Sequence, residues 1–491
     1  MQTLPGNIYS VESVREMDRT AIEDHGIPGY TLMSRAGAAA SRAARQGFPE
    51  AQRWQIVCGA GNNGGDGYVV ARLAANDGIV VSVLTLVDPE SLKGDASKAY
   101  EDFVAEGGMV MPWQGELDSD AELLVDAVLG SGLERDVGSE FAKAVAAINA
   151  HRAPVFALDI PTGIHGDSGK VMGTAVLADM TMTFVGLKTG LFLDEAPHYC
   201  GKLLFDGLEI PEDIHRVSPE FRRIDDHLLD TALPRRTRAA HKGDFGHVLV
   251  VGGGAGMPGA VRLCAEAALR VGAGLVSIAT DPSHAAVLTA TRPELMSHGV
   301  NDASDLDPLL ARANVIAFGP GLGQTDWARR LYEKVAADSR PQVWDADALN
   351  LLVAEPASAD NRVITPHPGE AARLLGCKTA DIQRDRRASA ADLAQRFGGI
   401  AVLKGAGSLV ASAAGDLSIC TGGNPGMASP GMGDVLTGII AGLLAQGLDL
   451  ETAALAGVEV HARAGDRSAR SGERGMIASD LLHELRAIVN P

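Results

Sequence analysis

Short aliphatic segments alternate with amphipathic segments along most of the chain, and this alternation predicts a parallel α/β architecture. Val14, Met17 and Ala21 recur at helical spacing, which predicts a helix over residues 11–24 that ends at the Gly26–Gly29 turn. Strands joined by helices form a mostly parallel sheet that is covered on both faces. Aliphatic runs in the first half predict strands at residues 55–58, 80–86, 123–129, 155–160 and 180–185.

The alternation lapses between residues 211 and 246, where the chain has three prolines, dense mixed charge and no strand-like run. We expect a linker there, with one short helix near residues 225–233. The alternation then resumes, so two domains, residues 1–215 and 225–491, are the simplest account. Aliphatic runs in the second half predict strands at residues 247–251, 275–279, 315–318, 342–344, 362–364 and 400–403.

Composition supports this architecture and excludes some partners. The 491 residues are 46% hydrophobic but only 4% aromatic, and they include 58 glycines, as suits aliphatic strands and glycine-rich turns. A net charge of −19 argues against nucleic-acid binding, because a phosphate backbone requires a basic face. Small anionic ligands remain compatible, since glycine loops and helix N-termini hold them without a basic surface.

The cysteines and the N-terminus bear on location. The five cysteines are scattered and form no CxxC pair, so neither a zinc site nor a disulfide framework is predicted. The N-terminus lacks the apolar core of a signal peptide, and no stretch approaches the roughly 18 apolar residues of a membrane span. We expect a cytoplasmic protein with no membrane partner, and we expect it to form a homo-oligomer.

A glycine-rich motif, GAGNNGGDG, spans Gly59–Gly67 between a predicted strand and a predicted helix. It contains the GxGxxG pattern of Rossmann dinucleotide sites, with Asp88 after the next strand. Asp66 argues against a bound pyrophosphate, because it would place a second anion at the helix N-terminus. A glycine turn with an aspartate helix cap is the alternative.

Two more predicted strands end in acids, Asp126 in VDAVLGSG and Asp159 in LDIPTGIHGDSG. Ligands of open parallel sheets collect beyond the carboxyl ends of the strands. Asn63, Asp126, Asp159 and Thr162 could therefore converge on one pocket, although each acid alone could be a turn-former or a cap.

In order and spacing, GNNGGDG, VDAVLGSG and LDIPTGIHGDSG resemble the NAD(P)H-hydrate epimerase family over about residues 10–210. The resemblance implies a potassium-binding enzyme that interconverts the R and S epimers of NADH and NADPH hydrated at C6 of the nicotinamide ring (NADHX and NADPHX). It also implies that Asp159 contacts the substrate as acid or base, and that Asn63, Asp126 and Thr162 bind potassium. The residues implied to line the substrate are Asn62, Asn63, Gly64, Gly65, Asp66, Gly130, Ser131, Gly132, Leu133, Glu134, Arg135, Asp136 and Asp159.

Three residues of this half qualify the resemblance. Thr162 and Ser131 stand where the family has Ser and Thr, and both exchanges keep the hydroxyl. Lys188 is either a second proton carrier or a surface or phosphate-pairing lysine.

In the second half, Gly431-Met432-Gly433-Asp434 is a glycine turn that leads into a predicted helix. Its free backbone N–H groups could hold the charge that develops on a transferring phosphoryl group. Asp434 is placed to take a proton from an attacking hydroxyl, or else it only caps the helix. His367 lies between two prolines, which presents it rigidly, but a structural histidine is the alternative.

Other glycine-bearing segments could hold a nucleotide. Lys404–Ser408 follows a predicted buried strand and could bind an adenine nucleotide through its backbone and ammonium. No Walker A sequence is present, which disfavours a P-loop ATPase. A second GxGxxG, Gly254–Gly259, lacks an acid at the end of the next strand before Asp281.

The second half resembles the ribokinase-like, ADP- or ATP-dependent NAD(P)H-hydrate dehydratase family over about residues 235–490. The segments that carry this resemblance are KGDFGHVLVVGG, GMPGA, GPGLG, DADALN, TPHPGE, LKGAGS and GNPGMASPGMGDVLTG. It implies phosphorylation of the C6 hydroxyl of the S hydrate, then loss of phosphate to restore NAD(P)H. We expect ADP with magnesium as the donor, and AMP and phosphate as products.

Residue by residue, the resemblance implies that Asp434 is the base. Ser408 stands where the family has Thr. The residues implied to contact the hydrate are Ala260, Gly323, His367 and Asp434, and those implied to hold the nucleotide are Lys404, Gly405, Ala406, Gly407, Ser408 and Gly433.

We therefore expect an α/β protein of two domains, an N-terminal Rossmann-like parallel-sheet sandwich and a C-terminal ribokinase-like domain. Together they predict a bifunctional enzyme that repairs hydrated NADH and NADPH. Two alternatives remain open. One is an NAD-dependent dehydrogenase built on the GxGxxG motifs, and the other is a small-molecule kinase fused to a non-catalytic ligand-binding module.

Overall fold

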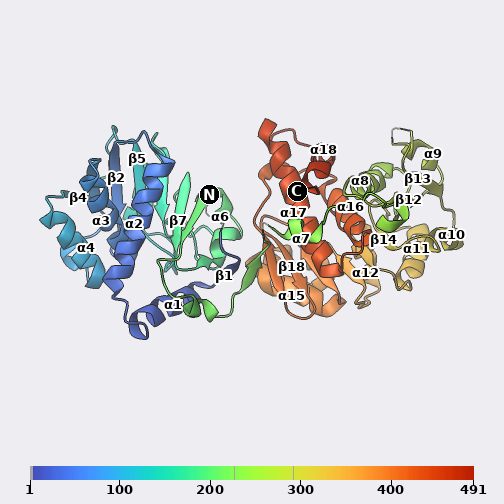
Figure 1. Ribbon diagram of the computed structural model, residues 1–491, viewed down its shortest axis with the longest axis horizontal. Helices are drawn as coiled ribbons and strands as arrows, with labels where there is room; N and C mark the ends of the chain where they lie inside the picture. The colour runs from blue at the N-terminus through green and yellow to red at the C-terminus, as the bar shows by residue number, and fades with distance from the viewer. Residues whose placement is uncertain (1–3, 226, 291, 491) are drawn as a thin grey trace. The chain divides into compact units, whose positions relative to one another are not determined.

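The computed structural model describes residues 4–225, 227–290 and 292–490. Its internal contacts divide the chain into two compact units, residues 1–222 and 223–491, which are described separately. Both units are α/β, as the alternation of aliphatic and amphipathic segments predicts (Figure 1).

Unit 1 contains a seven-stranded sheet in which every neighbouring pair of strands is parallel. The five predicted strands are confirmed as β2, β3, β5, β6 and β7, whereas the edge strands β4 and β9 were not predicted. The strand order reverses between β2 and β5, which creates a switch point at their carboxyl ends. In spatial order the strands are β4 (Val110–Pro112), β3 (Val80–Thr85), β2 (Arg53–Cys58), β5 (Leu123–Ala127), β6 (Val155–Leu158), β7 (Met180–Phe184) and β9 (Lys202–Asp206).

Successive strand residues of unit 1 pack on opposite faces of the sheet. Ile56 belongs to one buried cluster and Val57 to another, as the two-residue period of a strand requires. On the first face lie α1 (Val11–Glu23), α2 (Gly29–Gly47), α3 (Asn62–Asn76) and α4 (Gly94–Ala105); α5 (Ser139–Ala150) covers the other face. Helix α1 confirms the predicted first helix and buries Val14, Met17 and Ala21.

A small three-stranded arrangement completes unit 1. Strand β1 (Asn7–Tyr9) pairs in parallel with β8 (Leu187–Lys188) and antiparallel with β10 (Phe221–Arg223). The prediction that residues 211–246 contain no strand is therefore wrong. Three residues are too few to show an alternating pattern, and β10 forms because β1, more than two hundred residues away in sequence, offers it hydrogen-bond partners. The short helix expected in this segment is confirmed as α7 (Leu228–Ala232).

Unit 2 has a sheet that is parallel from β13 to β17 and ends in an antiparallel hairpin. All six predicted strands are confirmed, and β13, β18 and β19 were missed. The order again reverses beside the first strand, here between β11 and β14. In spatial order the strands are β13 (Met296–Gly299), β12 (Leu275–Thr280), β11 (His247–Val251), β14 (Val315–Phe318), β15 (Gln342–Trp344), β16 (Arg362–Ile364), β17 (Ile400–Leu403), β18 (Ser408–Ser412) and β19 (Leu417–Cys420).

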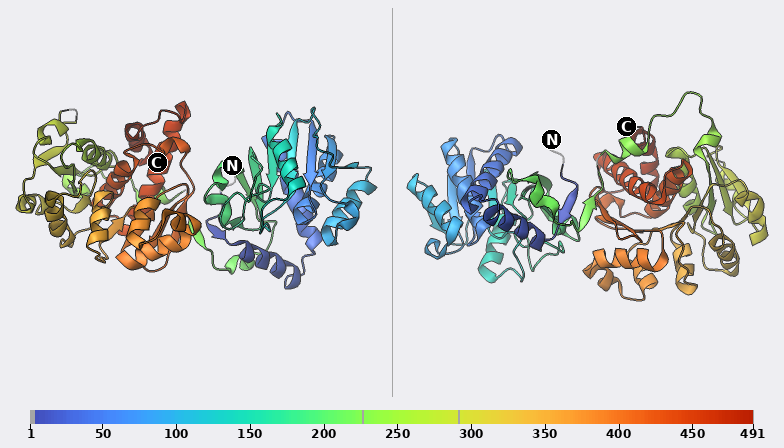
Figure 2. Two further views of the ribbon diagram at one scale, coloured as in Figure 1. Left: turned by 180° about the vertical axis from the view of Figure 1, so that it is seen from behind. Right: turned by 60° about the horizontal axis from the view of Figure 1, so that its bottom comes forward.

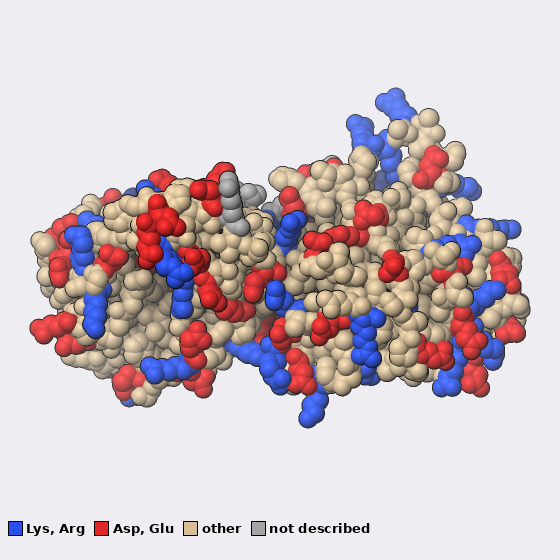
Figure 3. All heavy atoms as spheres, turned by 90° about the horizontal axis from the view of Figure 1, so that it is seen from below, with Lys and Arg blue, Asp and Glu red and all other residues tan. Residues whose placement is uncertain are grey.

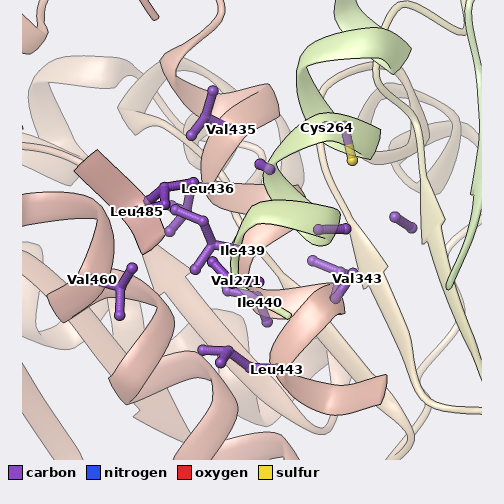
Figure 4. Packing of buried hydrophobic residues seen from close by; sticks show 14 of the residues in the cluster. Cys264, Val271, Val343, Val435, Leu436, Ile439, Ile440, Leu443, Val460 and Leu485 are labelled. Carbon is purple, nitrogen blue, oxygen red and sulfur yellow. The ribbon is translucent and has the colours of Figure 1, made fainter. Parts of the chain in front are cut away.

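Helices cover both faces of the unit 2 sheet (Figure 2). On one face α8 (Pro258–Arg270), α16 (Met432–Ala445), α17 (Leu450–Ser468) and α18 (Ala478–Ile488) share a core with Val248 and Val250 of β11. Figure 4 shows this packing, with apolar side chains of α16 lying between α8, α17 and the sheet. Elsewhere in unit 2, Tyr332 of α11 packs edge-on against Trp344 of β15.

The other helices of unit 2 follow individual strands along the chain. They are α9 (Ala285–Leu288), α10 (Asp307–Leu310), α11 (Asp326–Ala336), α12 (Asp347–Ala354), α13 (Pro368–Leu375), α14 (Thr379–Arg384) and α15 (Arg386–Phe397). Unit 1 also contains the short helix α6 (Ala196–Cys200).

Two observations concern possible interactions of the protein: the distribution of surface charge and the character of its helices. Across the face shown in Figure 3, acidic and basic side chains are interspersed. Within the described ranges, no helix combines the length and the apolar character that crossing a membrane would need.

Candidate active sites

A pocket of about 770 Å³ lies in unit 1 at the switch point, beyond the carboxyl ends of β2 and β5. The loop after β5 and the first turn of α3 supply one part of its lining, and α1 and α2 supply another. The structure therefore brings together motifs that are far apart in the sequence. Of the predicted substrate residues, the pocket is lined by Asn62, Asn63, Asp66, Gly130, Ser131, Gly132, Leu133, Glu134, Arg135 and Asp159.

Three predicted substrate residues are not among the residues that line this pocket. A Cβ on Gly64 would lie 2.2 Å from the Gly59 carbonyl oxygen, so this glycine allows α3 to start close to the preceding turn. A Cβ on Gly65 would lie 2.6 Å from Cε of Met33, so this glycine allows α2 to pack against α3. Asp136 is exposed.

Asp159 and Lys188 form a buried ion pair in the pocket. The Lys188 ammonium donates to Asp159 Oδ1 at 2.5 Å, to Thr183 Oγ1 at 3.0 Å and to the Phe184 carbonyl at 2.8 Å. Asp159 Oδ2 accepts the Ser131 backbone N–H at 2.9 Å. Lys188 is only 2% exposed, so the alternative of a surface lysine is wrong.

The surroundings of Asp159 keep it ionised. Burial favours the protonated acid, but the Lys188 charge and the hydrogen bonds from Lys188 and Ser131 hold the pKa of Asp159 below its ordinary value. Its backbone has φ of +64°, in the left-handed region that non-glycine residues rarely adopt. Such strain persists where surrounding contacts fix the residue, and here they fix a carboxylate in a pocket.

Of the other carboxyl groups that line the pocket, those of Asp18 and Asp66 are held toward the neutral form. Burial raises the pKa of Asp18 to about 6, with Lys188 opposing the shift and Asp159 adding to it. Burial also raises the pKa of Asp66 well above its ordinary value. Asp18 was not predicted, because one acid among the polar residues of an amphipathic helix carries no motif.

Asp126 and Thr162 are not among the residues that line the pocket, although the Thr162 hydroxyl accepts the N–H of Leu129, which does line it; Asp126 and Thr162 are hydrogen-bonded to each other. Asp126 Oδ2 accepts the Thr162 backbone N–H at 2.8 Å, and Asp126 Oδ1 accepts the Thr162 hydroxyl at 2.7 Å. Both residues are fully buried, and burial raises the pKa of Asp126 to about 6.

The residues predicted to bind a cation fit that role. Asn63 is 8% exposed, and neither the oxygen nor the nitrogen of its buried side-chain amide has a hydrogen-bond partner among the residues described. A buried polar group without a partner is costly, and a cation at the amide oxygen would satisfy it. Amide, hydroxyl and carboxylate oxygens with a single formal charge suit a monovalent cation better than a divalent one.

In unit 2 two glycine loops meet at the switch point between β11 and β14. The Gly253 N–H donates to the Pro320 carbonyl at 2.9 Å, and the Gly254 N–H donates to the Gly321 carbonyl at 2.7 Å. The Gly323 N–H donates to Asp347 Oδ2 at 2.8 Å, and Ala260 lies beside the same loop, 3.1 Å from where a Cβ on Gly321 would be.

The N-terminus of α16 approaches a buried cluster of charges. A Cβ on Gly433 would lie 3.0 Å from Asp345 Oδ2 and 3.1 Å from Lys404 Nζ, so the helix starts in close contact with both side chains. Asp434 follows in the first turn of the helix. Burial, and next the charge of Asp345, raise the pKa of Asp434 to about 7. A carboxylate with that pKa can accept a proton near neutral pH and release it again.

Lys404 is more strongly engaged by the protein than its sequence suggested. Its ammonium donates to Asp345 Oδ1 at 2.6 Å and lies 3.9 Å from Glu370 Oε2. Burial disfavours the charge, but Asp345 and Glu370 raise the pKa of Lys404 above its ordinary value. The second oxygen of Asp345 accepts the Thr437 hydroxyl at 3.1 Å. Any nucleotide contact of this ammonium would be made from within the ion pair.

The predicted nucleotide loop is held from both sides. The Ser408 hydroxyl donates to the Gly405 carbonyl at 3.0 Å, which closes the turn on itself. The guanidinium of Arg386 donates to the Gly407 carbonyl at 3.0 Å and to the Leu403 carbonyl at 3.4 Å. No sequence motif marks Arg386, since it lies at the start of α15, away from the loop in the chain.

His367 caps α13 and lies next to the charge cluster. Its Nδ1 accepts the Gly369 N–H at 3.0 Å, and its own backbone N–H donates to Glu370 Oε2 at 2.8 Å. Burial and the Lys404 charge lower the pKa of His367 below its ordinary value. The ring is therefore neutral near pH 7 with its proton on Nε2, and its side chain is 52% exposed.

Comparisons with known proteins cover both units. The family described as NAD(P)H-hydrate dehydratase matches residues 248–487, and the YjeF-related protein N-terminus matches residues 29–190. The bifunctional NAD(P)H-hydrate repair enzyme Nnr of Coxiella burnetii is 48% identical over 486 residues, which cover 99% of each chain. This chain belongs to the family of bifunctional NAD(P)H-hydrate repair enzymes. The enzyme of the same name from Escherichia coli is 44% identical and covers 100% of this chain and 95% of its own.

Within this repair-enzyme family the ribokinase-like fold of unit 2 is confirmed by a solved structure. A ribokinase-like superfamily protein from Enterococcus faecalis is 29% identical with a TM-score of 0.52, and the match covers 55% of this chain and 95% of that one. These matches do not support the dehydrogenase alternative; Asp88, the candidate for its ribose-binding acid, is exposed and accepts the Glu90 N–H as the cap of a short 3-10 helix.

Proposed function

We propose that this chain restores hydrated NADH and NADPH, with one reaction in each unit. Unit 1 interconverts the R and S hydrates, and unit 2 dehydrates the S hydrate at the expense of ADP, with release of AMP and phosphate. The observation that carries the proposal is Asp434, a carboxyl group with a pKa of about 7 at the N-terminus of α16, beside a glycine turn.

In unit 1 the hydrate occupies the pocket at the switch point, where Asp159 contacts it and the turn of Asn62 and Asn63 lies against it. Potassium would be held by Asn63, Asp126 and Thr162. When bound, the ion would supply positive charge near an anionic dinucleotide and would tie together the loops after β2, β5 and β6. The partnerless amide of Asn63 supports this assignment.

In unit 2 the hydrate lies among Ala260, Gly323 and His367, with its C6 hydroxyl toward Asp434. Asp434 takes the hydroxyl proton while the oxygen attacks the β-phosphorus of ADP, and AMP leaves with the bonding electrons. Free N–H groups at the start of α16, that of Gly433 among them, hold the charge on the phosphoryl oxygens. Phosphate then leaves C6 as N1 donates its lone pair, and loss of a C5 proton restores the dihydronicotinamide.

The nucleotide is held by Lys404–Ser408 and Gly433. Arg386 fixes this loop by donating hydrogen bonds to the backbone carbonyls of Leu403 and Gly407. Asp345 and Glu370 are already engaged by Lys404, so magnesium would be held mainly by the phosphate oxygens with which it arrives.

One experiment tests both reactions. A mixture of R and S hydrated NADH is incubated with the full chain, with and without ADP, while NADH absorbance and the epimer ratio are followed. We expect complete conversion of both epimers to NADH with ADP, and equilibration of the epimers without it. If only the S hydrate is converted to NADH, unit 1 is not an epimerase. A stable phosphorylated product would favour the small-molecule kinase alternative.

A further inference from the structure

One face of α1 forms a wall of the unit 1 pocket. Val11, Val14, Arg15, Asp18 and Ile22 all line it, and their spacing of three and four residues is that of a single helical face. Asp18 is the only acid in this set. The first helix therefore delivers a carboxyl group to the pocket that also holds Asp66 of α3 and Asp159 of the loop after β6.

Four ionisable side chains of the pocket form one electrostatic group: Asp18, Asp66, Asp159 and Lys188. Lys188 and Asp159 neutralise each other. All three N–H bonds of the Lys188 ammonium are donated to protein acceptors, and each oxygen of Asp159 accepts a hydrogen bond. Moving a proton to or from either partner would break this arrangement, so the pair is a poor carrier of protons.

Asp18 has the opposite character. Within the part of the chain that the structure describes, its carboxyl group has neither a hydrogen bond nor an ion pair, while it faces the pocket. Burial raises its pKa to about 6, so the acid and its carboxylate are both populated near neutral pH. Where two acids of one site are driven apart in pKa, their chemical roles differ as well.

We propose that Asp18 is the proton carrier of the epimerase, and that the Lys188-bound carboxylate of Asp159 is a fixed charge that positions the hydrate. This inference rests on the function proposed above for unit 1. It departs from the acid–base role that the family resemblance implies for Asp159.

The chemistry needs only one such carrier. C6 of the hydrate bears both a hydroxyl and the ring nitrogen N1, so it is a hemiaminal. The Asp18 carboxylate takes the hydroxyl proton, the oxygen forms a carbonyl bond to C6, and the C6–N1 bond breaks with its electron pair going to N1. N1 takes the proton from Asp18. Rotation about C5–C6 presents the other face of the aldehyde, and the reverse sequence closes the ring as the opposite epimer with Asp18 unchanged.

The test uses the full chain and the exchange rate between the epimers, measured by NMR without ADP over a range of pH. Because Asp18 must start as a carboxylate, the wild-type rate should fall as the pH drops through about 6. In Asp18→Asn, kcat should fall by roughly 10²–10⁴, the usual contribution of acid–base catalysis, and the acidic limb should disappear while KM changes little. Asp18→Glu should recover part of the rate and the limb. Asp159→Asn should raise KM and keep the limb.

Glu12→Gln is the matched control, because Glu12 is an exposed acid on the same helix and should behave as wild type. Dehydration of the S hydrate by unit 2 reports that each variant is folded. If Asp18→Asn keeps both the wild-type rate and its acidic limb, Asp18 is not the carrier. If the wild type itself does not exchange the epimers, the proposed function of unit 1 fails and the inference fails with it.

Discussion

Both oxygens of the Asp126 carboxylate accept hydrogen bonds from one residue, Thr162, at 2.8 Å from its backbone N–H and 2.7 Å from its hydroxyl. The two residues follow or end neighbouring parallel strands, β5 and β6, so this double link fixes the loop after β6 against the loop after β5. Asn63, at the start of the helix after the neighbouring strand β2, has an amide without a hydrogen-bond partner among the described residues.

This link gives the potassium site a sharp test. Asp126→Asn keeps the shape of the side chain but removes the only charge of the proposed ligand set. We expect it to raise the potassium concentration for half-maximal epimerisation by roughly tenfold or more, the scale of a lost hydrogen bond to a charged group. Thr162→Ser retains the hydroxyl and should follow the wild-type curve. Potassium curves that coincide for Asp126→Asn and wild type, each normalised to folded protein, would assign Asp126 to the turn alone.

The proposed role of Asp434 as the base of the second reaction leads to the next prediction. Asp434→Asn should lower the dehydration rate of the S hydrate by ~10²–10⁴, since it removes a general base, while ADP binding measured by calorimetry survives. Epimerisation by unit 1 in the same protein is the internal control. A turnover near that of the wild type would remove Asp434 from the mechanism.

The raised pKa of Asp434 also sets the direction of the pH dependence. The base must be ionised to act, and its pKa is about 7 rather than its ordinary value, so the rate should rise with pH through about 7 and level off above it. Below that point the rate should fall about tenfold per pH unit, as the ionised fraction does. An acidic limb centred near the ordinary pKa of an aspartate would show that the group is not held in the neutral form.

The packing of α16 against α8 requires a glycine at position 438. A Cβ on Gly438 of α16 would lie 2.0 Å from the Cys264 carbonyl oxygen of α8, so Gly438→Ala must separate the two helices. We expect a loss of ~1–3 kcal/mol in the free energy of unfolding from urea titration, as for other overpacked cores. Gly259→Ala, in the first turn of α8, adds its Cβ to open space and should be neutral or stabilising by about 0.4–1 kcal/mol. Equal stabilities for the two variants would contradict this packing.

The sequence predicts the parts of the fold that local patterns specify. Aliphatic runs followed by glycine turns identify the central strands of both sheets, because buried parallel strands are hydrophobic throughout. Short strands such as β10 and β13 show no such run, since they have only three or four residues and these are not buried throughout. The turn motifs likewise predict most of the pocket lining, because strand ends of a parallel sheet necessarily meet at one edge.

The missed site residues have a common physical reason. Asp18 and Arg386 lie on helices, where polar residues are the ordinary solvent-facing kind, and only tertiary packing turns these two toward a pocket and a loop. Lys188 could not be assigned from sequence for the same reason, because its three acceptors lie on the preceding strands and loops. Sequence motifs identify the backbone turns of a site, whereas tertiary packing determines which charged side chains lie beside those turns.

The division of the chain leads to the final prediction, which concerns fragments. Phe221 is 1% exposed and pairs with Ile8, and the Glu220 carboxylate accepts the Thr189 hydroxyl at 2.9 Å, so residues up to 222 complete unit 1. Ile224 is 4% exposed and donates its N–H to the Ile419 carbonyl, so it belongs to unit 2.

We therefore expect a fragment of residues 1–222 to epimerise hydrates without nucleotide, and one of residues 223–491 to dehydrate only the S hydrate. A fragment that stops at residue 215 loses a buried phenylalanine and a strand, and its free energy of unfolding should be lower by about 3–5 kcal/mol, the cost of removing such a side chain from a core. Urea titration of the two N-terminal fragments measures this difference. If either longer fragment folds, as judged by circular dichroism, yet lacks its reaction, the division of labour between the units is wrong. If the fragments ending at 215 and 222 are equally stable, β10 contributes nothing to unit 1, and the boundary lies earlier in the chain.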